Sequence, residues 1–163
     1  MTINAILAID KANGIGRNGE LPWPRNDADM KWFYDCTKNN VVVMGSNTWR
    51  SIGNKKLPNR INIVCTNGTV EGDPDRAVSV PHYDTLKFLQ NLKMEYPSRK
   101  IWIIGGAKVY TQMIPYCDHL YLTVFDNTYD CDTFIDPSLL AGFTVLTSQK
   151  TIGECNFSIW SRL

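Results

Sequence analysis

The chain has 163 residues and a formal net charge of +1, with acidic and basic side chains interspersed along it. This length suits one domain over residues 1–163, and the charge balance excludes the basic surface expected of a protein that binds nucleic acid or an anionic membrane. A small molecule is therefore the expected partner. The five cysteines are odd in number and lack CxxC spacing, which indicates reduced thiols in the cytoplasm and neither disulfides nor a metal site.

The amino-terminal part begins with an apolar run at residues 3–9, which predicts the first strand and is too short to span a bilayer. Residues 10–20 contain three glycines, a composition that favours a mobile loop. Trp23 follows between two prolines, which fix its backbone. Residues 26–39 are predicted to form a helix, because acidic residues near the start, including Asp29, complement the helix dipole.

Three buried strands are predicted to end in polar or glycine-bearing turns. Two of them are the mainly apolar runs at residues 41–45 and 61–65, and the third, at residues 101–104, leads into Gly105-Gly106. Ligands of open α/β sheets bind beyond the carboxyl ends of the strands, so these turns are expected to line one crevice. The two glycines allow a pyrophosphate to approach the backbone closely, although the same pair is also typical of a plain turn between strand and helix.

The second half of the chain is predicted to add a helix and an antiparallel edge. Residues 84–94 have the apolar spacing of a helix, whose apolar side is formed by Leu86, Phe88, Leu89 and Leu92. Residues 119–124 alternate between apolar and polar side chains, and further short strands are predicted at residues 144–146 and 157–160. Strands and helices that alternate in this way make α/β the predicted fold class.

A series of short motifs spans most of the chain. In chain order they are Ala8-Ile9-Asp10, Gly14-Ile15-Gly16, Leu21-Pro22-Trp23, Asp29 with Trp32-Phe33, Val43-Met44-Gly45 with Thr48-Trp49 and Ser51-Ile52-Gly53, Leu57-Pro58 with Arg60, and Ile104-Gly105-Gly106 with Val109-Tyr110. The order of these motifs, their spacing and the total length of the chain resemble those of the dihydrofolate reductase family. The resemblance runs from about Ile3 to Arg162.

The resemblance implies a mostly parallel eight-stranded central sheet with an antiparallel C-terminal hairpin and about four flanking helices. It implies an oxidoreductase that reduces 7,8-dihydrofolate to 5,6,7,8-tetrahydrofolate with hydride from NADPH, in support of one-carbon and thymidylate metabolism. A cytoplasmic monomer is expected, with antifolate inhibitors as further ligands.

The resemblance also implies which residues meet the substrate. Asp29 pairs with the amino group and a ring nitrogen of the pteridine, and Thr123 supports Asp29. Ile6 offers its backbone carbonyl to the same amino group. Leu21 covers the nicotinamide ring, and Trp23 joins it among the catalytic residues. The slot for the pteridine and benzoyl rings is implied to be lined by Phe33, Ile52 and Leu57, and the substrate's glutamate carboxylate to be clamped by Arg60.

Several of these residues have a simpler explanation when each is considered alone. An ordinary core would explain Phe33, Ile52 and Leu57. A role as a packing anchor would explain Trp23. Thr123 is a common choice within a strand. Arg60 after a turn is typically a solvated surface residue.

The implied cofactor is NADPH, held mainly by the turns after the buried strands. The residues implied to bind it are Ala8, Ile15, Gly16, Gly45, Ser46, Asn47, Thr48, Thr66, Asn67, Gly105, Gly106, Ala107, Lys108, Val109 and Tyr110, with a cis peptide joining Gly105 to Gly106. Many members of the family place Arg or Lys against the 2′-phosphate where this chain has Ser46 and Asn67. NADH is therefore a possible alternative cofactor, and Lys108, Arg76 and Lys55 are the candidate replacement cations.

Two other functions compete with this one. A pyrimidine reductase of riboflavin synthesis shares the sheet and the cofactor turn, but Asp29, Phe33 and the turn at residues 57–60 are evidence against it. A catalytically silent dinucleotide- or folate-binding module is the second alternative. The presence of Asp29, Thr123 and Arg60 together is evidence against a loss of activity.

Overall fold

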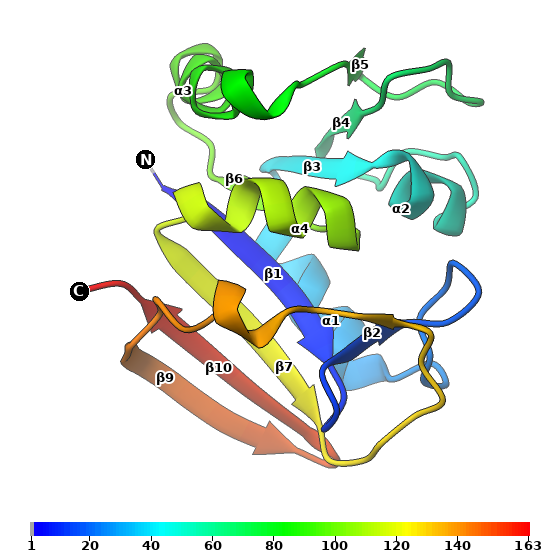
Figure 1. Ribbon diagram of the computed structural model, residues 1–163, viewed down its shortest axis with the longest axis vertical. Coiled ribbons are helices and arrows are strands. Elements are labelled where there is room, and N and C mark those ends of the chain that lie inside the picture. Colours follow the sequence, from blue (N-terminus) through cyan, green and yellow to red (C-terminus); the bar gives the residue numbers. More distant parts are fainter. Residues whose placement is uncertain (1) are drawn as a thin grey trace.

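The computed structural model describes residues 2–163, which form a central sheet with helices on both of its faces (Figure 1). The strands of this sheet are β1 (Ile3–Ile9), β3 (Val41–Gly45), β4 (Ile61–Cys65), β5 (Arg76–Val78), β6 (Ile101–Ile103), β7 (His119–Phe125), β9 (Val145–Ile152) and β10 (Cys155–Ser161). A second, two-stranded sheet pairs β2 (Gly14–Gly16) with β8 (Thr133–Phe134). The helices are α1 (Asp27–Thr37), α2 (Ser46–Ser51), α3 (Thr85–Glu95) and α4 (Ala107–Met113), and the short 3₁₀ turns are η1 (His82–Asp84), η2 (Ile114–Tyr116) and η3 (Pro137–Leu139).

The eight strands lie in the order β5-β4-β3-β6-β1-β7-β10-β9. Every pairing from β5 to β7 is parallel, whereas β10 runs antiparallel to both β7 and β9. The predicted α/β fold, with a mostly parallel eight-stranded sheet and an antiparallel C-terminal hairpin, is therefore confirmed. Parallel neighbours place the carboxyl ends of β3, β4 and β6 at one edge, so the turns after them lie together.

The central strands are buried on both faces, as their continuous apolar sequences predicted. Val41, Val43 and Ile63 pack in one cluster with α3 and α4, whereas Val42 and Met44 pack on the opposite face. Each of these side chains contributes roughly 1.5–3 kcal/mol by leaving water. The strands therefore hold the turns that follow them in fixed positions.

The C-terminal hairpin is longer than predicted. The expected strand at residues 144–146 is in fact β9, which continues to Ile152 and pairs with β10. Most of its side chains are exposed and polar, so no hydrophobic pattern marks them as a strand. Backbone pairing with β10 makes this segment a strand, and that pairing depends on the tertiary fold.

Helix α3 buries most of its predicted apolar side, with the exception of Leu86. Leu86 is 47% exposed, whereas Leu89 and Leu92 are buried. Thr85 is also fully buried and lies four residues before Leu89, on the same face of the helix. Thr85 therefore belongs to the buried face as well, and its hydroxyl donates to the carbonyl of His82 at 2.9 Å.

The segment at residues 10–20, which was predicted as a loop because of its glycines, contains a short strand, β2. The buried Asp10 accounts for much of this order, because its carboxylate accepts backbone N–H groups of Ala12 at 2.9 Å, Gly14 at 2.8 Å and Tyr129 at 2.9 Å. Burial by itself raises the pKa of Asp10, but these donors together with the Cys131 thiol hold it below its usual value. Of the helices in residues 2–163, none is long and apolar enough to cross a membrane.

Candidate active site

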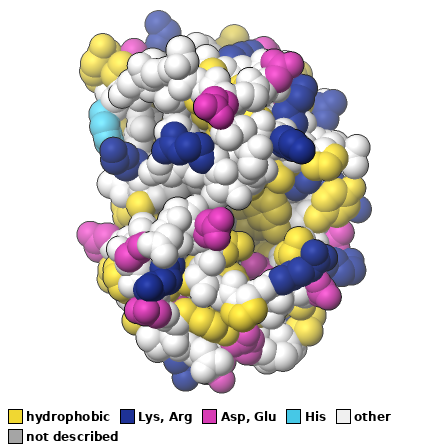
Figure 2. All heavy atoms as spheres, turned by 90° about the vertical axis from the view of Figure 1, so that its right-hand side faces the viewer, with side chains coloured by type: hydrophobic (Ala, Val, Ile, Leu, Met, Phe, Trp, Pro, Cys, Tyr) yellow, Lys and Arg dark blue, Asp and Glu magenta, His cyan; other side chains and the backbone are white. Residues whose placement is uncertain are grey.

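A cleft of about 780 Å³ lies beyond the carboxyl ends of β3, β4 and β6. Figure 2 shows this side of the molecule as a hollow with hydrophobic side chains at its centre and Lys and Arg side chains along its rim. Every residue that the resemblance assigned to the cofactor lines this cleft, Ala8 and Asn67 among them. Residues from five separate segments of the sequence therefore meet at the predicted crevice.

The Gly105-Gly106 turn forms one wall of the cleft, and its peptide bond is cis. Gly105 has a φ of +109° and lies so close to Tyr110 that an added Cβ would be 3.0 Å from its ring. At Gly45, an added Cβ would be 3.1 Å from Val109 Cγ2, and the Gly45 N–H donates to the Gly105 carbonyl at 2.8 Å. Glycine at both positions lets the ends of two strands and the start of α4 approach closely.

The opposite side of this turn is open. A Cβ built on Gly106 would meet only the Thr48 hydroxyl, at 3.5 Å, and one built on Gly68 would meet nothing within 4 Å. Both glycines therefore leave backbone facing free space in the cleft. A pyrophosphate fits such a wall, because small residues leave room for its oxygens to approach the backbone amides.

Asp29 lies in the first turn of α1, where its backbone N–H donates to the Asn26 side chain at 2.9 Å. Its own carboxyl is half-buried, and this burial raises its pKa above the ordinary value. A hydrogen bond from the Thr123 hydroxyl acts in the opposite direction by stabilising the carboxylate. Thr123 pairs in register with Ala8, which lines the cleft, so the acid lies close to the part of the cleft that Ala8 lines.

Ile6 and Tyr110 connect β1 to α4 below the cleft. The Tyr110 hydroxyl donates to the Ile6 carbonyl at 2.7 Å, and both residues are buried. The carbonyl that the resemblance assigned to the pteridine amino group therefore already accepts one hydrogen bond. A carbonyl oxygen has a second lone pair, which remains for a ligand.

The side chains assigned to the substrate slot are neither fully buried nor free in solvent. Phe33, Ile52 and Leu57 are half-buried, and each packs on the cluster that contains Met44 and Trp49. An ordinary core would cover them completely. Phe33 also lies one turn after Asp29 on α1, and partly exposed apolar side chains near an acid suit a slot for flat rings.

Arg60 is held by the protein and is not freely solvated. Its Nη1 donates to the Thr37 hydroxyl at 3.1 Å and its Nε to the Pro58 carbonyl at 2.9 Å. The guanidinium carbon lies 5.8 Å from the centre of the Phe33 ring and 5.2 Å from that of Tyr34. These contacts fix the guanidinium next to the slot, where a fork of N–H groups suits a carboxylate.

Trp23 and Leu21 are neighbours with opposite environments. Trp23 is buried and stacks on Phe125 with ring centroids 4.1 Å apart, so it is a packing anchor in this structure. Leu21 is 64% exposed and lines the edge of the cleft. The anchored tryptophan therefore holds the chain next to a side chain that is free to cover a ligand.

The comparison with known proteins agrees with this geometry. The family model described as dihydrofolate reductase matches residues 2–159. The chain belongs to the dihydrofolate reductase family. Dihydrofolate reductase of Drosophila melanogaster is 36% identical over 82% of this chain and 79% of its own length. The viral dihydrofolate reductase of Saimiriine herpesvirus 2 is 33% identical, over 90% of this chain and 74% of its own.

Solved structures give the same result. A dihydrofolate reductase of Enterococcus faecalis, complexed with NADP(H) and RAB-propyl, has a TM-score of 0.77 and 28% sequence identity, and the match covers 99% of this chain and 96% of that one. As a dihydrofolate reductase, the chain is an NADPH-dependent enzyme that reduces 7,8-dihydrofolate to tetrahydrofolate. The family match decides against the riboflavin-pathway reductase and the silent binding module.

The replacement cations suggested by the sequence have different surroundings in this dihydrofolate reductase. Arg76 is hydrogen-bonded to Glu95, and Lys55 is exposed and does not line the cleft. Lys108 does line it. Ser46 and Asn67, the two neutral residues where many family members have Arg or Lys, also line the cleft, as the resemblance implied.

Sequence reasoning missed several residues that shape this dihydrofolate reductase site. The Asp132 carboxylate accepts the Asn18 N–H at 2.8 Å, and the Asp132 N–H donates to the Gly16 carbonyl at 3.0 Å, so the β8 region holds the loop that precedes Leu21. Gln112 and Arg50 also line the cleft. Helical spacing offered a signal for both, since each lies four residues after a predicted cofactor residue.

Proposed function

We propose that the cleft holds NADPH with its nicotinamide beside Ala8 and its adenosine beside Asn67, and that Asp29 acts on the pteridine of dihydrofolate. The observation that supports this arrangement is the register of β1 and β7. Ala8, which lines the cleft, pairs with Thr123, whose hydroxyl lowers the pKa of the Asp29 carboxyl. The acid and the cofactor cleft are therefore two sides of one site. When bound, NADPH supplies the hydride.

Asp29 orients and polarises the pteridine. Its two carboxylate oxygens can accept hydrogen bonds from an amino group and from an adjacent ring N–H, a pairing that holds the ring in one orientation. A carboxylate in this half-buried site also stabilises positive charge on the ring, because the surroundings screen it less than water does. Thr123 positions the carboxyl and does not itself touch the reacting atoms.

Leu21 and Trp23 protect the reacting end of the cleft from water. Leu21 is the exposed side chain at the edge, and Trp23 fixes the chain beside it by stacking on Phe125. Water excluded from the site strengthens the field of Asp29. We assign Leu21 to cover the ring and Trp23 to hold that cover in position.

Substrate affinity is assigned to the slot and to Arg60. Phe33, Ile52 and Leu57 offer partly exposed apolar surface to the rings, and the fixed guanidinium of Arg60 is placed to bind the substrate's remote carboxylate. The Ile6 carbonyl accepts the pteridine amino group with its second lone pair. Antifolates, which present the same rings, are expected to bind in the same slot.

The proposal also covers the domain organisation, the location and the oligomeric state of the protein. One sheet crosses residues 2–163, which supports a single domain, and all five cysteines are free thiols, which supports the reducing cytoplasm. We expect a monomer, with no nucleic-acid or membrane partner.

An assay of the purified chain tests the proposed function. With NADPH and dihydrofolate together, the near-ultraviolet absorbance of NADPH should fall, and it should stay constant when either compound is omitted. A methotrexate-type antifolate should abolish the reaction. Absence of turnover by a folded chain that binds NADPH would contradict the assigned roles.

A further inference from the structure

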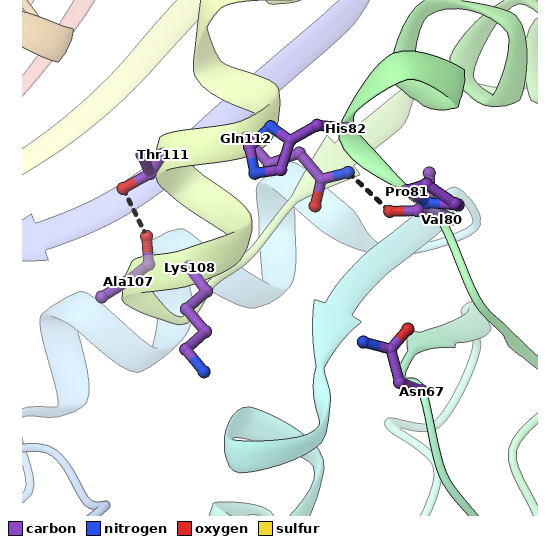
Figure 3. Close-up of a pocket in the computed structure, with 8 residues that line it drawn as sticks. All are labelled: Asn67, Val80, Pro81, His82, Ala107, Lys108, Thr111 and Gln112. Atoms are coloured by element: carbon purple, nitrogen blue, oxygen red, sulfur yellow. Dashed lines mark hydrogen bonds between the residues drawn. The ribbon is translucent and has the colours of Figure 1, made fainter.

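A second cavity, of about 570 Å³, adjoins the cofactor cleft and shares Asn67, Ala107 and Lys108 with it. Figure 3 shows Gln112 at its wall, where the side chain donates a hydrogen bond to the Val80 carbonyl at 2.8 Å. Because the two cavities have walls in common, the second is an extension of the cofactor cleft and not a separate site. A support of the site that the sequence did not predict lies elsewhere, beside the anchored Trp23.

Tyr129 flanks the stacked rings of Trp23 and Phe125. Its ring centroid lies 5.9 Å from that of Trp23 and 6.2 Å from that of Phe125, at interplanar angles of 68° and 85°. Since these distances are nearly equal and both angles are steep, Tyr129 lies at the side of the stack. The apolar cluster that the three rings form also contacts Ala8, which lines the cofactor cleft, whereas Tyr129 itself does not line it.

The hydroxyl of Tyr129 is bound to the turn between β9 and β10. It lies 2.9 Å from Glu154 Oε1 and 2.8 Å from Glu154 Oε2, and Asn127 Nδ2 donates to the same carboxylate at 3.0 Å. The hydrogen bond to Glu154 raises the pKa of Tyr129, so the phenol stays protonated at neutral pH and acts as the donor. The backbone supports this pairing, because the Asp126 N–H donates to the Glu154 carbonyl at 2.8 Å.

The backbone of Tyr129 is held from a third direction. Its N–H donates to Asp10 Oδ2 at 2.9 Å, and its carbonyl accepts the Cys131 N–H at 2.9 Å. Residues 126–132 are irregular, and residues 126–128 and 130 are exposed, whereas Tyr129 is half-buried. Contacts at the ring, the hydroxyl and the backbone therefore determine where this side chain lies.

We propose that Tyr129, held by Glu154, is a positioning residue that sets the location of Trp23 and thereby of the Leu21 cover during hydride transfer. This inference rests on the roles proposed above for Trp23 and Leu21. Tyr129 acts through the indole and does not touch the cofactor or the substrate. The C-terminal hairpin, which carries Glu154, thus becomes part of the support of the active site.

The geometry gives the route of this effect. The stack on Phe125 restrains the Trp23 indole along the stacking direction, and Tyr129 restrains it against sliding sideways. Pro22 joins Trp23 to Leu21 and restricts the backbone between them. A displacement of the indole is therefore passed on to the side chain at the edge of the cleft.

Single-turnover measurements of hydride transfer, at saturating NADPH and dihydrofolate, test this role. Tyr129→Phe removes the hydroxyl and keeps the ring, and Glu154→Ala removes the acceptor. Each should slow hydride transfer by about threefold to tenfold, because a small displacement of the covering group misaligns the reacting atoms. The affinity for NADPH should change by less than about twofold, because Tyr129 does not line the cleft. Glu154→Gln, which keeps an acceptor oxygen, should recover most of the rate.

Fluorine NMR of the ligand-free chain, labelled with fluorotryptophan, gives a readout that does not depend on turnover. Tyr129→Phe should shift or broaden the resonance of Trp23, assigned with Trp23→Phe. The resonances of Trp49 and Trp102, which are buried in a different cluster, should stay in place. An unchanged Trp23 resonance would overturn the inference.

Two further variants separate positioning from simple stability. In a Leu21→Ala background, Tyr129→Phe should slow hydride transfer by less than about twofold, because the group through which it acts is absent. Thr151→Val is the matched control, because it removes the hydrogen bond that Asn156 Nδ2 donates to Thr151 at 3.1 Å in the same hairpin. This control should transfer hydride at the wild-type rate.

The other outcomes contradict the inference in distinct ways. Wild-type rates in both Tyr129→Phe and Glu154→Ala would remove the role of the pair and leave the proposed function intact. Equal slowing in Thr151→Val would reduce that role to stability of the hairpin. Full slowing by Tyr129→Phe in the Leu21→Ala background would separate Tyr129 from the cover. A wild-type chain that binds NADPH and transfers no hydride would contradict the proposed function itself.

Discussion

The Thr123 hydroxyl on β7 lowers the pKa of the Asp29 carboxyl on α1, against the larger effect of burial, although the two residues lie far apart in the sequence. Asp29→Asn should keep the fold and cofactor binding but slow turnover at least about tenfold at neutral pH, equivalent to roughly 1.4 kcal/mol of barrier. The amide carries no charge to stabilise a protonated pteridine. The rate of the variant should recover on acidification, as dihydrofolate becomes protonated in solution.

Asp27 provides the control for this experiment. It lies two residues earlier, is exposed and pairs with Arg25 at 2.9 Å. Asp27→Asn should leave turnover unchanged and cost a few tenths of a kcal/mol to about 1 kcal/mol of stability, because it removes only a charge near the helix start. Rate–pH profiles of both variants decide the matter. A fully active Asp29→Asn together with an inactive Asp27→Asn would mean that Asp27, and not Asp29, is the acid that acts on the pteridine.

The same carboxyl should make stability depend on pH. Because burial raises the pKa of Asp29 in the folded state above 3.8, the folded chain holds this proton more tightly than the unfolded chain does. The free energy of unfolding should therefore fall as the pH rises from about 3.8 through the folded-state pKa. Asp29→Asn should lack this contribution and gain stability relative to the wild type over that range. Urea denaturation without ligands, at a series of pH values, measures the difference, and a difference independent of pH would refute the prediction.

Asp10 should show the opposite pH dependence. Its pKa lies below 3.8 in the folded state, so its contribution to stability is present above that pH and is lost as the pH falls through the folded-state pKa. Asp10→Asn leaves buried backbone N–H groups with a poorer acceptor and should cost about 1–3 kcal/mol at neutral pH. The cost should shrink in acid. Asp126→Asn, which removes an exposed partner of Lys11, is the control and should cost at most about 1 kcal/mol.

Arg60→Leu should raise the KM for dihydrofolate by about tenfold to a hundredfold and largely spare kcat. The remote carboxylate is bound equally in the ground state and the transition state, so its loss weakens binding without changing the chemical step. Arg60→Lys should also be impaired, because an ammonium does not reproduce the fork of the guanidinium. Steady-state kinetics with Arg25→Leu as the exposed control provide the test, and an unchanged KM would identify Arg60 as structural.

The preference for NADPH over NADH should be smaller than in relatives with several basic contacts. Ser46 and Asn67 are neutral, and Lys108 is the cation at the adenosine end of the cleft. One charged contact is worth roughly 1.5–3 kcal/mol, which is about tenfold to a hundredfold. The ratio of kcat/KM for the two cofactors measures the preference. A ratio above about a thousandfold would require a further cation and contradict this reading of the site.

Sequence patterns predicted the elements whose signal is local. The strands at residues 3–9, 41–45 and 61–65 have the predicted bounds, because a strand buried on both faces must be apolar along its length. The polar strand β9 and the short pair β2–β8 carry no such pattern. Their backbone hydrogen bonds come from neighbours that are distant in sequence, so only the assembled sheet defines them.

The sequence by itself predicted the central strands, because glycines and apolar runs act on the chain near them, and its motifs indicated the family, whose resemblance implied the residues that line the cofactor cleft. The tertiary structure decided which of these residues meet. Asp10 joins Tyr129, Asp132 holds Asn18, and Lys108 faces the cavity that Asn67 also lines. A charge interacts with whatever folding brings within a few ångströms of it, at any separation along the chain, so its partner is a property of the three-dimensional arrangement.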